Sequence, residues 1–265
     1  MAGLNSIVEG HKKNPFKRSR WNIGLWILVV TYLVYSIGSL GLSAERFLSG
    51  IGHASTLLDR MFPPNFERWE LLLSGLVESL EIAMISSVSG IFLSLFIGIL
   101  AARNLMPPWV SVPIRGFVAL CRSFHPVIIA ILFVKSVGFG ALAGILTLII
   151  ASIGFIAKLF AEAIEEISFK QVEAIRATGA NFSSVVIYAV MPQVFSRFIG
   201  FATYQFDSNL RNSTMVGIVG AGGLGGTLFS AFQRFDYDFV AAILITIISL
   251  ILVWEFLSTL VRRVF

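Results

Sequence analysis

The most chemically suggestive residues of this sequence are arginines that interrupt long apolar segments. Arg122 lies seven residues beyond Arg115 within one such segment. Ionisable groups inside a bilayer are costly and are functional hypotheses by default. A planar guanidinium binds phosphorus oxyanions through paired hydrogen bonds. The alternative is that both arginines extend to lipid phosphates at the inner interface. We take Arg122 as a candidate anion-binding residue and keep both interpretations open.

A second polar group follows a later apolar segment. Asp207 and Arg211 are four residues apart, so they could pair on one helix face, and we expect that role first. Asn209, Arg211, Ser213 and Thr214 could alternatively line a polar pathway. They are therefore candidate substrate-pathway residues together with Arg122.

Cys121 and His125 offer a thiol and an imidazole four residues apart. On a continuous helix they would share a face, as a nucleophile and its base must, but no third orienting group is evident. A lone histidine beside a proline more often bonds to a freed backbone carbonyl, and we expect that role for His125. The chain has a single cysteine, so no intrachain disulfide can form and a metal cluster is not expected.

A glycine-rich stretch at residues 217–227 reads GIVGAGGLGGT. Gly220, Gly222 and Gly225 match the dinucleotide fingerprint, which has meaning only between a strand and a helix. The stretch also approximates a P-loop, but Gly226 stands where the phosphate-binding lysine is required. We therefore expect no nucleotide binding and no ATPase activity of the chain itself. A broken helix near a transport pathway is favoured over a plain outer loop.

The composition indicates a membrane protein. Of the 265 residues, 56% are hydrophobic and only 13% are charged, and the mean hydropathy is +0.85. A soluble domain has about 25% charged residues. The net charge of +5 comes with a basic cluster before the first apolar segment, which indicates a bilayer rather than a nucleic acid as the partner.

Six apolar segments are long enough to cross a bilayer as helices. They are Trp21–Leu42, Leu71–Ala102, Val112–Val137, Ala141–Phe160, Val185–Phe206 and Phe239–Leu260. The first is too long for the core of a cleaved signal peptide. We expect an all-α protein of six transmembrane helices. Its parts are a cytoplasmic N-terminus at 1–20, a first span at 21–43, an extracytoplasmic loop at 44–70 and a five-helix core at 71–265.

The charge distribution predicts the orientation. Basic residues favour the cytoplasmic side, and they gather at both ends of the chain: Lys12, Lys13, Lys17, Arg18, Arg20, Arg262 and Arg263. Six crossings return the chain to the side on which it started. We therefore expect both termini, and the loop at 161–184, to be cytoplasmic.

That loop contains the sequence SFKQVEAIRATG at residues 168–179. Ser168 and Gln171 have the spacing of a capping box, and Gly179 suits the left-handed residue after a helix. The helix between them, about 16 Å long, is too short and polar to cross the bilayer. We expect Val172, Ile175 and two alanines to form a face that docks on a partner. The alternative is an amphipathic helix resting on the membrane surface.

The spacing of this loop resembles the EAA loop of ABC-importer permeases. Glu173, Ala174, Gly179 and Pro192 stand at relative positions 1, 2, 7 and 20. The resemblance implies that they belong to a coupling helix that docks on the ATP-hydrolysing subunit. The departures are Ile175, Ala189 and Met191.

Further segments resemble the phosphonate-importer permeases of the ABC class over roughly residues 70–260. They are ESLEIA at 78–83, LAARNL at 100–105, the segment at 138–167 and FDSNLRNSTMVGIVGAGGLG at 206–225. Arg115 and Arg122 match a pair of arginines in the family. The sequence RSFHP at 122–126 lacks an acidic residue that many members have after the proline.

The resemblance implies a type I ABC-importer permease fold with a cytoplasmic coupling helix, in the bacterial inner membrane. It implies as partners an ATPase dimer that binds the ATP, a second permease copy or a paralogue, and an extracytoplasmic substrate-binding protein. The cargo would be phosphonate or a related phosphorus oxyanion, and the chain would need no cofactor of its own. The alternatives are an ABC permease for another small solute and a secondary transporter, although no inverted repeat is evident.

Overall fold

The computed structural model describes residues 20–41 and 43–264, and the side chains of 21–41 and 43–260. The predicted N-terminal orientation depends on Lys12, Lys13, Lys17 and Arg18, which lie outside the described residues, as do the side chains of Arg20, Arg262 and Arg263. The described part of the chain contains helices and no strand, which confirms the predicted all-α class. The chain divides into two compact units, residues 1–59 and 60–265.

The first unit contains α1 (Arg20–Ser39) and most of α2 (Ala44–Met61). Residues Trp21–Ser39 are long and apolar enough to cross a membrane, and none of them is buried. Such a helix suits contact with lipid. The segment predicted as a loop at 44–70 contains α2, whose 18 residues have no buried member.

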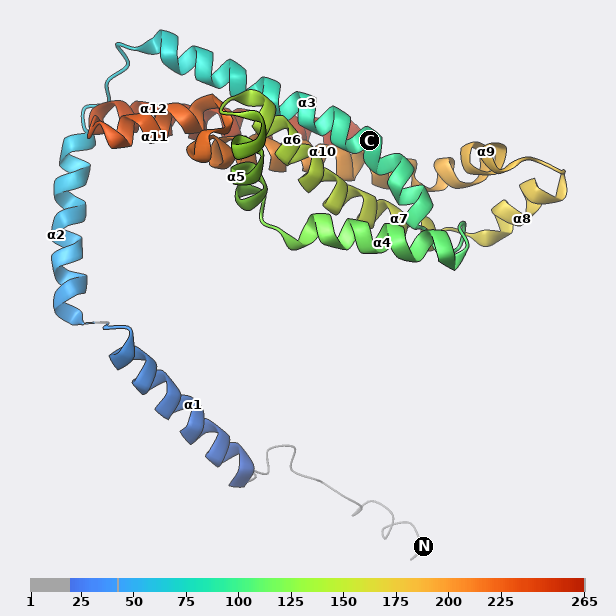
Figure 1. Cartoon of the computed structure of the whole chain (residues 1–265), viewed down its shortest axis with the longest axis horizontal. Helices are drawn as coiled ribbons and strands as arrows, with labels where there is room; N and C mark the ends of the chain where they lie inside the picture. Colours follow the sequence, from blue (N-terminus) through green and yellow to red (C-terminus); the bar gives the residue numbers. More distant parts are fainter. Residues whose placement is uncertain (1–19, 42, 265) are drawn as a thin grey trace, which may run out of the picture. The chain divides into compact units, whose positions relative to one another are not determined.

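The second unit is built around α3 (Trp69–Ala101), a continuous helix of 33 residues. It packs along α6 (Ala141–Ser152), which continues through the π-helix η1 (Ile153–Ala157) into α7 (Lys158–Glu165) (Figure 1). Small residues permit this close packing: a side chain at Gly90 would overlap Ser152. The fourth predicted span is therefore present and extends to residue 165.

The third predicted span, Val112–Val137, is wrong as a continuous helix. It consists of α4 (Pro108–Ser123) and α5 (Pro126–Val137), which are bent by 90° relative to each other. The backbone at 124–125 is extended, and at His125 the proline that follows disfavours the helical region. The described chain thus has five helices able to span a membrane, or six if this bent pair counts as one.

The fifth predicted span, Val185–Phe206, ends too early. The helical path runs from α9 (Phe182–Val185) through the π-helix η2 (Val186–Val190) into α10 (Met191–Val216). It continues through the π-helix η3 (Gly217–Ala221) as a stretch of 40 residues. Hydropathy falls after Phe206 because residues 207–214 are mostly polar, yet Asp207 and Arg211 pair with each other and Asn209 bonds to α3 and α6.

The glycine-rich stretch breaks a helix, as predicted. Gly220 and Gly222 have φ values of 97° and 85°, and α11 (Gly223–Gln233) begins directly afterwards. The backbone N–H of Leu224 donates to Ser79 Oγ of α3 at 2.8 Å. A side chain at Gly225 would overlap the carbonyl oxygen of Thr214, so the backbones approach more closely than any other residue allows.

The two ends of α3 mark two ends of the second unit. At its start, Arg68 forms an ion pair with Asp236, which precedes α12 (Tyr237–Val264). At its other end, Asn104 Nδ2 donates to the carbonyl oxygen of Ile164, in α7, at 2.7 Å. The short helices α8 (Phe169–Ala177) and α9 follow α7 at this second end (Figure 1).

Candidate functional site

The apolar side of α8 faces the protein's own core. Val172 is fully buried and Ile175 is half-buried against it. Their neighbours in this core come from α7, α9, η2 and α10: Phe160, Ala163, Ile164, Val185, Ala189, Val190 and Val194. The predicted docking face that contained Val172 and Ile175 is therefore wrong, because these apolar side chains are more stable inside the bundle. The opposite face is free, and Glu173, Ala174 and Ala177 are exposed on it.

The start of α8 is fixed by α10 and not by a capping box. Ser168 precedes the helix without a capping hydrogen bond from its side chain, so that prediction is wrong. The backbone N–H of Ser168 instead donates to Gln193 Oε1 at 2.9 Å, and Gln193 Nε2 donates to Ala189 O at 2.7 Å. A side chain of α10 thus satisfies the free backbone N–H at the start of α8.

The end of α8 is a left-handed turn at Gly179. Its φ is +78°, and no atom lies within 4 Å of the position that a Cβ would occupy. The glycine is therefore required by backbone conformation and not by crowding. The turn leads into Asn181, whose side chain accepts a hydrogen bond from Ser184 N at 2.9 Å and caps α9.

The four residues of the predicted coupling motif are all exposed, and three of them gather on α8 and its turn. Glu173 and Ala174 lie on the free face, and Gly179 follows the helix. Pro192 lies in the first turn of α10, next to Gln193. An ion pair between Arg197 and Glu166, at 2.5 Å, further joins α10 to the residues before α8.

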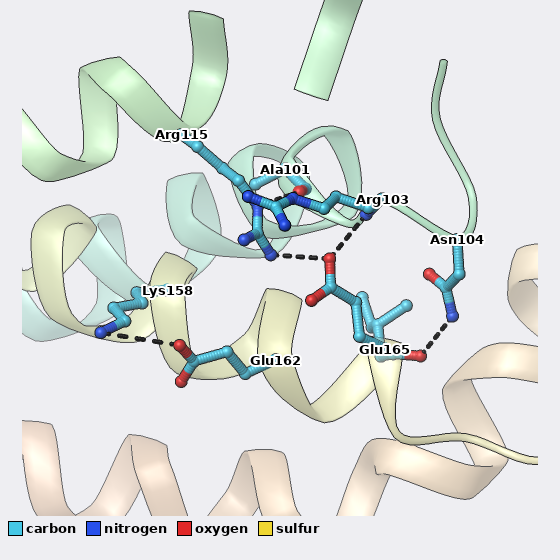
Figure 2. Close-up of polar contacts among 8 residues, drawn as sticks. Ala101, Arg103, Asn104, Arg115, Lys158, Glu162 and Glu165 are labelled. Carbon is cyan, nitrogen blue, oxygen red and sulfur yellow. Dashed lines mark hydrogen bonds and ion pairs between the residues drawn. The ribbon is translucent and has the colours of Figure 1, made fainter. Parts of the chain in front are cut away.

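Arg115 supports the helix that precedes α8. Its Nη2 donates to Glu165 Oε1 at 2.6 Å and its Nε donates to the carbonyl oxygen of Ala101 at 2.9 Å. The backbone N–H of Arg103 also donates to Glu165 Oε1, at 2.8 Å (Figure 2). Arg115 is thus bonded within the protein, which is a different structural role from the predicted contact with lipid phosphates.

The candidate pathway residues separate into three environments. Arg122 is exposed in the last turn of α4, at the bend, and lines a cavity to which α10 contributes no residue. Asn209 and Ser213 are buried within the bundle. Arg211 is exposed and forms the predicted ion pair with Asp207, while Thr214 is half-buried.

Asn209 belongs to a buried hydrogen-bond network that joins three helices. Its Nδ2 donates to Ser87 Oγ of α3 at 2.9 Å and to Ser152 Oγ of α6 at 3.0 Å. Gln205 Nε2 donates to Asn209 Oδ1 at 2.9 Å and to Ser152 Oγ at 3.0 Å. Asn209 thus fills its hydrogen bonds inside the subunit, and this contact also places Arg211 near mid-depth of α3.

Sequence reasoning missed Gln205, Ser87 and Ser152. Their signal was present in the small residues along one face of α3, which with the exception of the adjacent pair 86–87 are three to seven positions apart: Gly75, Ser79, Ser86, Ser87, Gly90, Ser94 and Gly98. Small residues at such intervals mark close packing between membrane helices. Which polar side chains of other helices meet this face depends on the tertiary arrangement.

The Cys121–His125 pair does not form one helix face. Cys121 is buried in α4, whereas His125 lies beyond the end of that helix and precedes α5. The His125 Nδ1 accepts a hydrogen bond from Val127 N at 3.4 Å. The predicted bond to a freed carbonyl is thus replaced by a helix cap, since a helix start presents N–H groups.

The class of protein follows from comparison with known proteins. Residues 94–264 match the family described as the binding-protein-dependent transport system inner membrane component. The phosphite transport system permease protein PtxC of Stutzerimonas stutzeri is 37% identical over 225 residues, which cover 84% of this chain and 82% of PtxC. The chain belongs to this family of inner-membrane transport components, and it is a multi-pass membrane protein.

Another relative is the phosphate-import permease protein PhnE of Mycolicibacterium smegmatis, 34% identical over 258 residues. The match covers 97% of this chain and 48% of that protein, so the chain spans about half the length of this relative. A chain of the inward-facing MetNI methionine ABC transporter is similar in structure, with a TM-score of 0.66 and 24% identity. That match covers 76% of this chain and 98% of the MetNI chain. The fold is that of a type I ABC-importer permease, as predicted.

Proposed function

We propose that this chain is the permease subunit of an ATP-driven importer for phosphonate or a related phosphorus oxyanion. Its membership of the binding-protein-dependent transport family carries the proposal. The names of PtxC and PhnE, which refer to phosphite and phosphate, support the cargo class. The chain itself would bind no ATP and need no cofactor.

The geometry of α8 supports a coupling role. This helix of nine residues is held at its start by Gln193 and on one side by the buried Val172, while Glu173 and Ala174 remain exposed. A rigid helix with small side chains on its exposed face can dock in a groove on a partner, and we take that partner to be the separate ATPase. Because one chain offers one such helix, an ATPase dimer requires two permease subunits, either two copies or a paralogue pair.

The exposed face of α10 supports a pathway that is completed by a second permease subunit. Tyr204 and Arg211 are exposed on this helix, and Ser208 and Asn212 are half-buried. A charged side chain facing lipid near mid-membrane costs about 2.5–3.5 kcal/mol. That cost is avoided if this face lines a polar pathway between subunits. The cargo oxyanion would then exchange with Asp207 as the partner of Arg211.

The proposal is tested by uptake in cells that lack phosphonate and phosphite transport. The chain is produced with an ATPase and a substrate-binding protein encoded beside it, and uptake of phosphonate, phosphite and phosphate is measured. ATP-dependent uptake of at least one of them, lost when the ATPase is inactivated, is the expected result. Uptake that persists without the ATPase would favour a secondary transporter. Transport of only an unrelated solute would leave the ABC permease class but exclude this cargo.

A further inference from the structure

A basic cavity of 420 Å³ opens where the end of α3 meets α4 and α7. Its polar lining consists of six side chains: Arg103, Arg115, Arg122, Ser123, Lys158 and Glu162. The rest of the lining is alanine and valine. The cavity lies at the same end of the second unit as α8 and is separate from the exposed face of α10.

Two of its four cations are neutralised by the protein. Arg115 is bound to Glu165, and Lys158 lies 3.6 Å from Glu162 (Figure 2). The guanidinium groups of Arg103 and Arg122 form no hydrogen bond or ion pair with any residue within the described ranges. The cavity therefore has an excess of two positive charges, both on side chains that bind planar or tetrahedral oxyanions in paired fashion.

We propose that this cavity binds a phosphate-type dianion between Arg103 and Arg122. Two free guanidinium groups on different elements can contact one anion from two directions. Arg115 and Lys158 add further positive potential, although their carboxylate partners offset part of it. The same chemistry is presented by free inorganic phosphate and by the phosphomonoester headgroup of phosphatidic acid.

The position of the cavity links it to the support of α8. Glu165 is the last residue of α7 and lies three positions before Ser168. Its Oε1 accepts hydrogen bonds from the backbone N–H of Arg103 and from Arg115 Nη2. An anion held in the cavity would also attract the guanidinium of Arg115, which lines the cavity and binds Glu165. The proposed site therefore lies beside the junction that leads into α8, and Arg115 belongs to both. The inference does not depend on which cargo the importer carries.

The first experiment measures binding to the purified full-length chain. In nanodiscs of phosphatidylcholine alone, inorganic phosphate is titrated by calorimetry. In parallel, nanodiscs with added phosphatidic acid are analysed by native mass spectrometry for retained lipid. We expect Arg103→Gln/Arg122→Gln to weaken binding by at least about tenfold, because it removes two charge-assisted contacts. Lys170→Gln/Arg176→Gln removes the same charge from exposed positions of α8 and is the matched control.

The outcomes separate the sources of the anion. Phosphate binding that is lost in the cavity variant identifies a free anion, and retention of phosphatidic acid that is lost there identifies a lipid headgroup. Binding of neither probe to the wild-type protein overturns the proposal, as does an equal loss in the control variant. If the double variant is not recovered as a monodisperse protein, Arg122→Gln alone, at an exposed position, is measured against the same criteria.

Discussion

The side chain of Gln193, at the start of α10, bonds the backbone of Ser168, which lies 25 residues earlier and directly precedes α8. Ser168 N–H donates to Gln193 Oε1 at 2.9 Å, and Gln193 Nε2 reaches Ser168 O at 3.5 Å. The proposed coupling helix, α8, is therefore attached directly to α10, the helix that carries the exposed Arg211. A displacement of α8 by a partner would act on α10 through this contact and through the Arg197–Glu166 ion pair.

The first prediction concerns this attachment. Gln193→Ala leaves the Ser168 N–H without its partner, so the first turn of α8 should open more often. Hydrogen exchange of the amides of residues 168–172 should accelerate by roughly tenfold, for a loss of about 1–1.5 kcal/mol. Gln171→Ala is the matched control, because that side chain is exposed and forms no cap. Faster hydrogen exchange in Gln171→Ala than in Gln193→Ala would contradict this prediction and would support a capping box at the start of α8.

The α8 region shows what sequence could and could not give. The position of Gly179 followed from local chemistry, because a left-handed residue after a short helix favours glycine. The role of Gln193 was not predictable, because Ser168 and Gln171 offered a local capping pattern and nothing in the sequence shows that a residue of α10 reaches Ser168. The orientation of Val172 was misjudged for the same reason: an apolar face can dock on a partner or on its own core, and only packing decides between them.

The second prediction tests the turn at Gly179. Since its Cβ position is open space and its φ is +78°, substitutions should rank by their tolerance of left-handed backbone. Gly179→Asn should retain most uptake, whereas Gly179→Val should lose most of it, since a β-branched residue is strained there by about 1–2 kcal/mol. Gly179→Asp adds a charge beside the docking face and should reduce ATPase co-purification below that of Gly179→Asn.

The readout for this series is paired: membrane abundance of the permease and the amount of ATPase retained on it. Abundance should stay near wild type, because the turn is exposed. Full ATPase retention and normal uptake in Gly179→Asp would mean that the loop is not a coupling helix.

The third prediction separates structure from transport at the Asp207–Arg211 pair. Asp207 is buried, and its partner Arg211 has a side chain that is 53% exposed. Arg211→Gln leaves a buried carboxylate without its ion-pair partner and should lower membrane abundance strongly. Asp207→Asn/Arg211→Gln removes both charges and should restore abundance without restoring oxyanion uptake. Wild-type uptake by the double variant would show that the pair has only a structural role.

The limits of the predicted spans also have a physical explanation. Hydropathy placed the end of the fifth span at Phe206, because Asp207, Asn209 and Arg211 follow it. In the structure, Asp207 pairs with Arg211, and Asn209 donates hydrogen bonds to Ser87 of α3 and Ser152 of α6. A polar residue whose partners lie on other helices cannot be told from a loop residue by hydropathy. The bend in the third span could have been predicted from Pro126, because a proline disfavours helical backbone at the residue before it, and His125 is extended in the structure.

The fourth prediction concerns the buried network around Asn209. Asn209 forms hydrogen bonds with Ser87, Ser152 and Gln205, and interhelical bonds in membranes average about 0.6 kcal/mol each. Two of these bonds join α10 to α3 and α6, and the third lies within α10, so Asn209→Ala should lower stability by about 1.2 kcal/mol, or roughly 2–5 °C in the unfolding midpoint. The Asn212 side chain forms a hydrogen bond only with Ser208, within the same helix, among the described residues, so Asn212→Ala should shift the midpoint by less than about 2 °C. Equal shifts would argue against the network.

The last prediction concerns orientation in the membrane. The residues that mark the two ends of the second unit are Ala174, exposed on α8, and Phe235, exposed before α12. The proposed ATPase contact requires α8 to be cytoplasmic, so α3, which runs between the two ends, places Phe235 on the extracytoplasmic side. The single native cysteine, Cys121, is buried and should label slowly. In spheroplasts, a membrane-impermeant thiol reagent should label Phe235→Cys and spare Ala174→Cys, and in inverted vesicles the pattern should reverse. Labelling of Ala174→Cys from outside would place α8 away from any cytoplasmic ATPase and would contradict the coupling role.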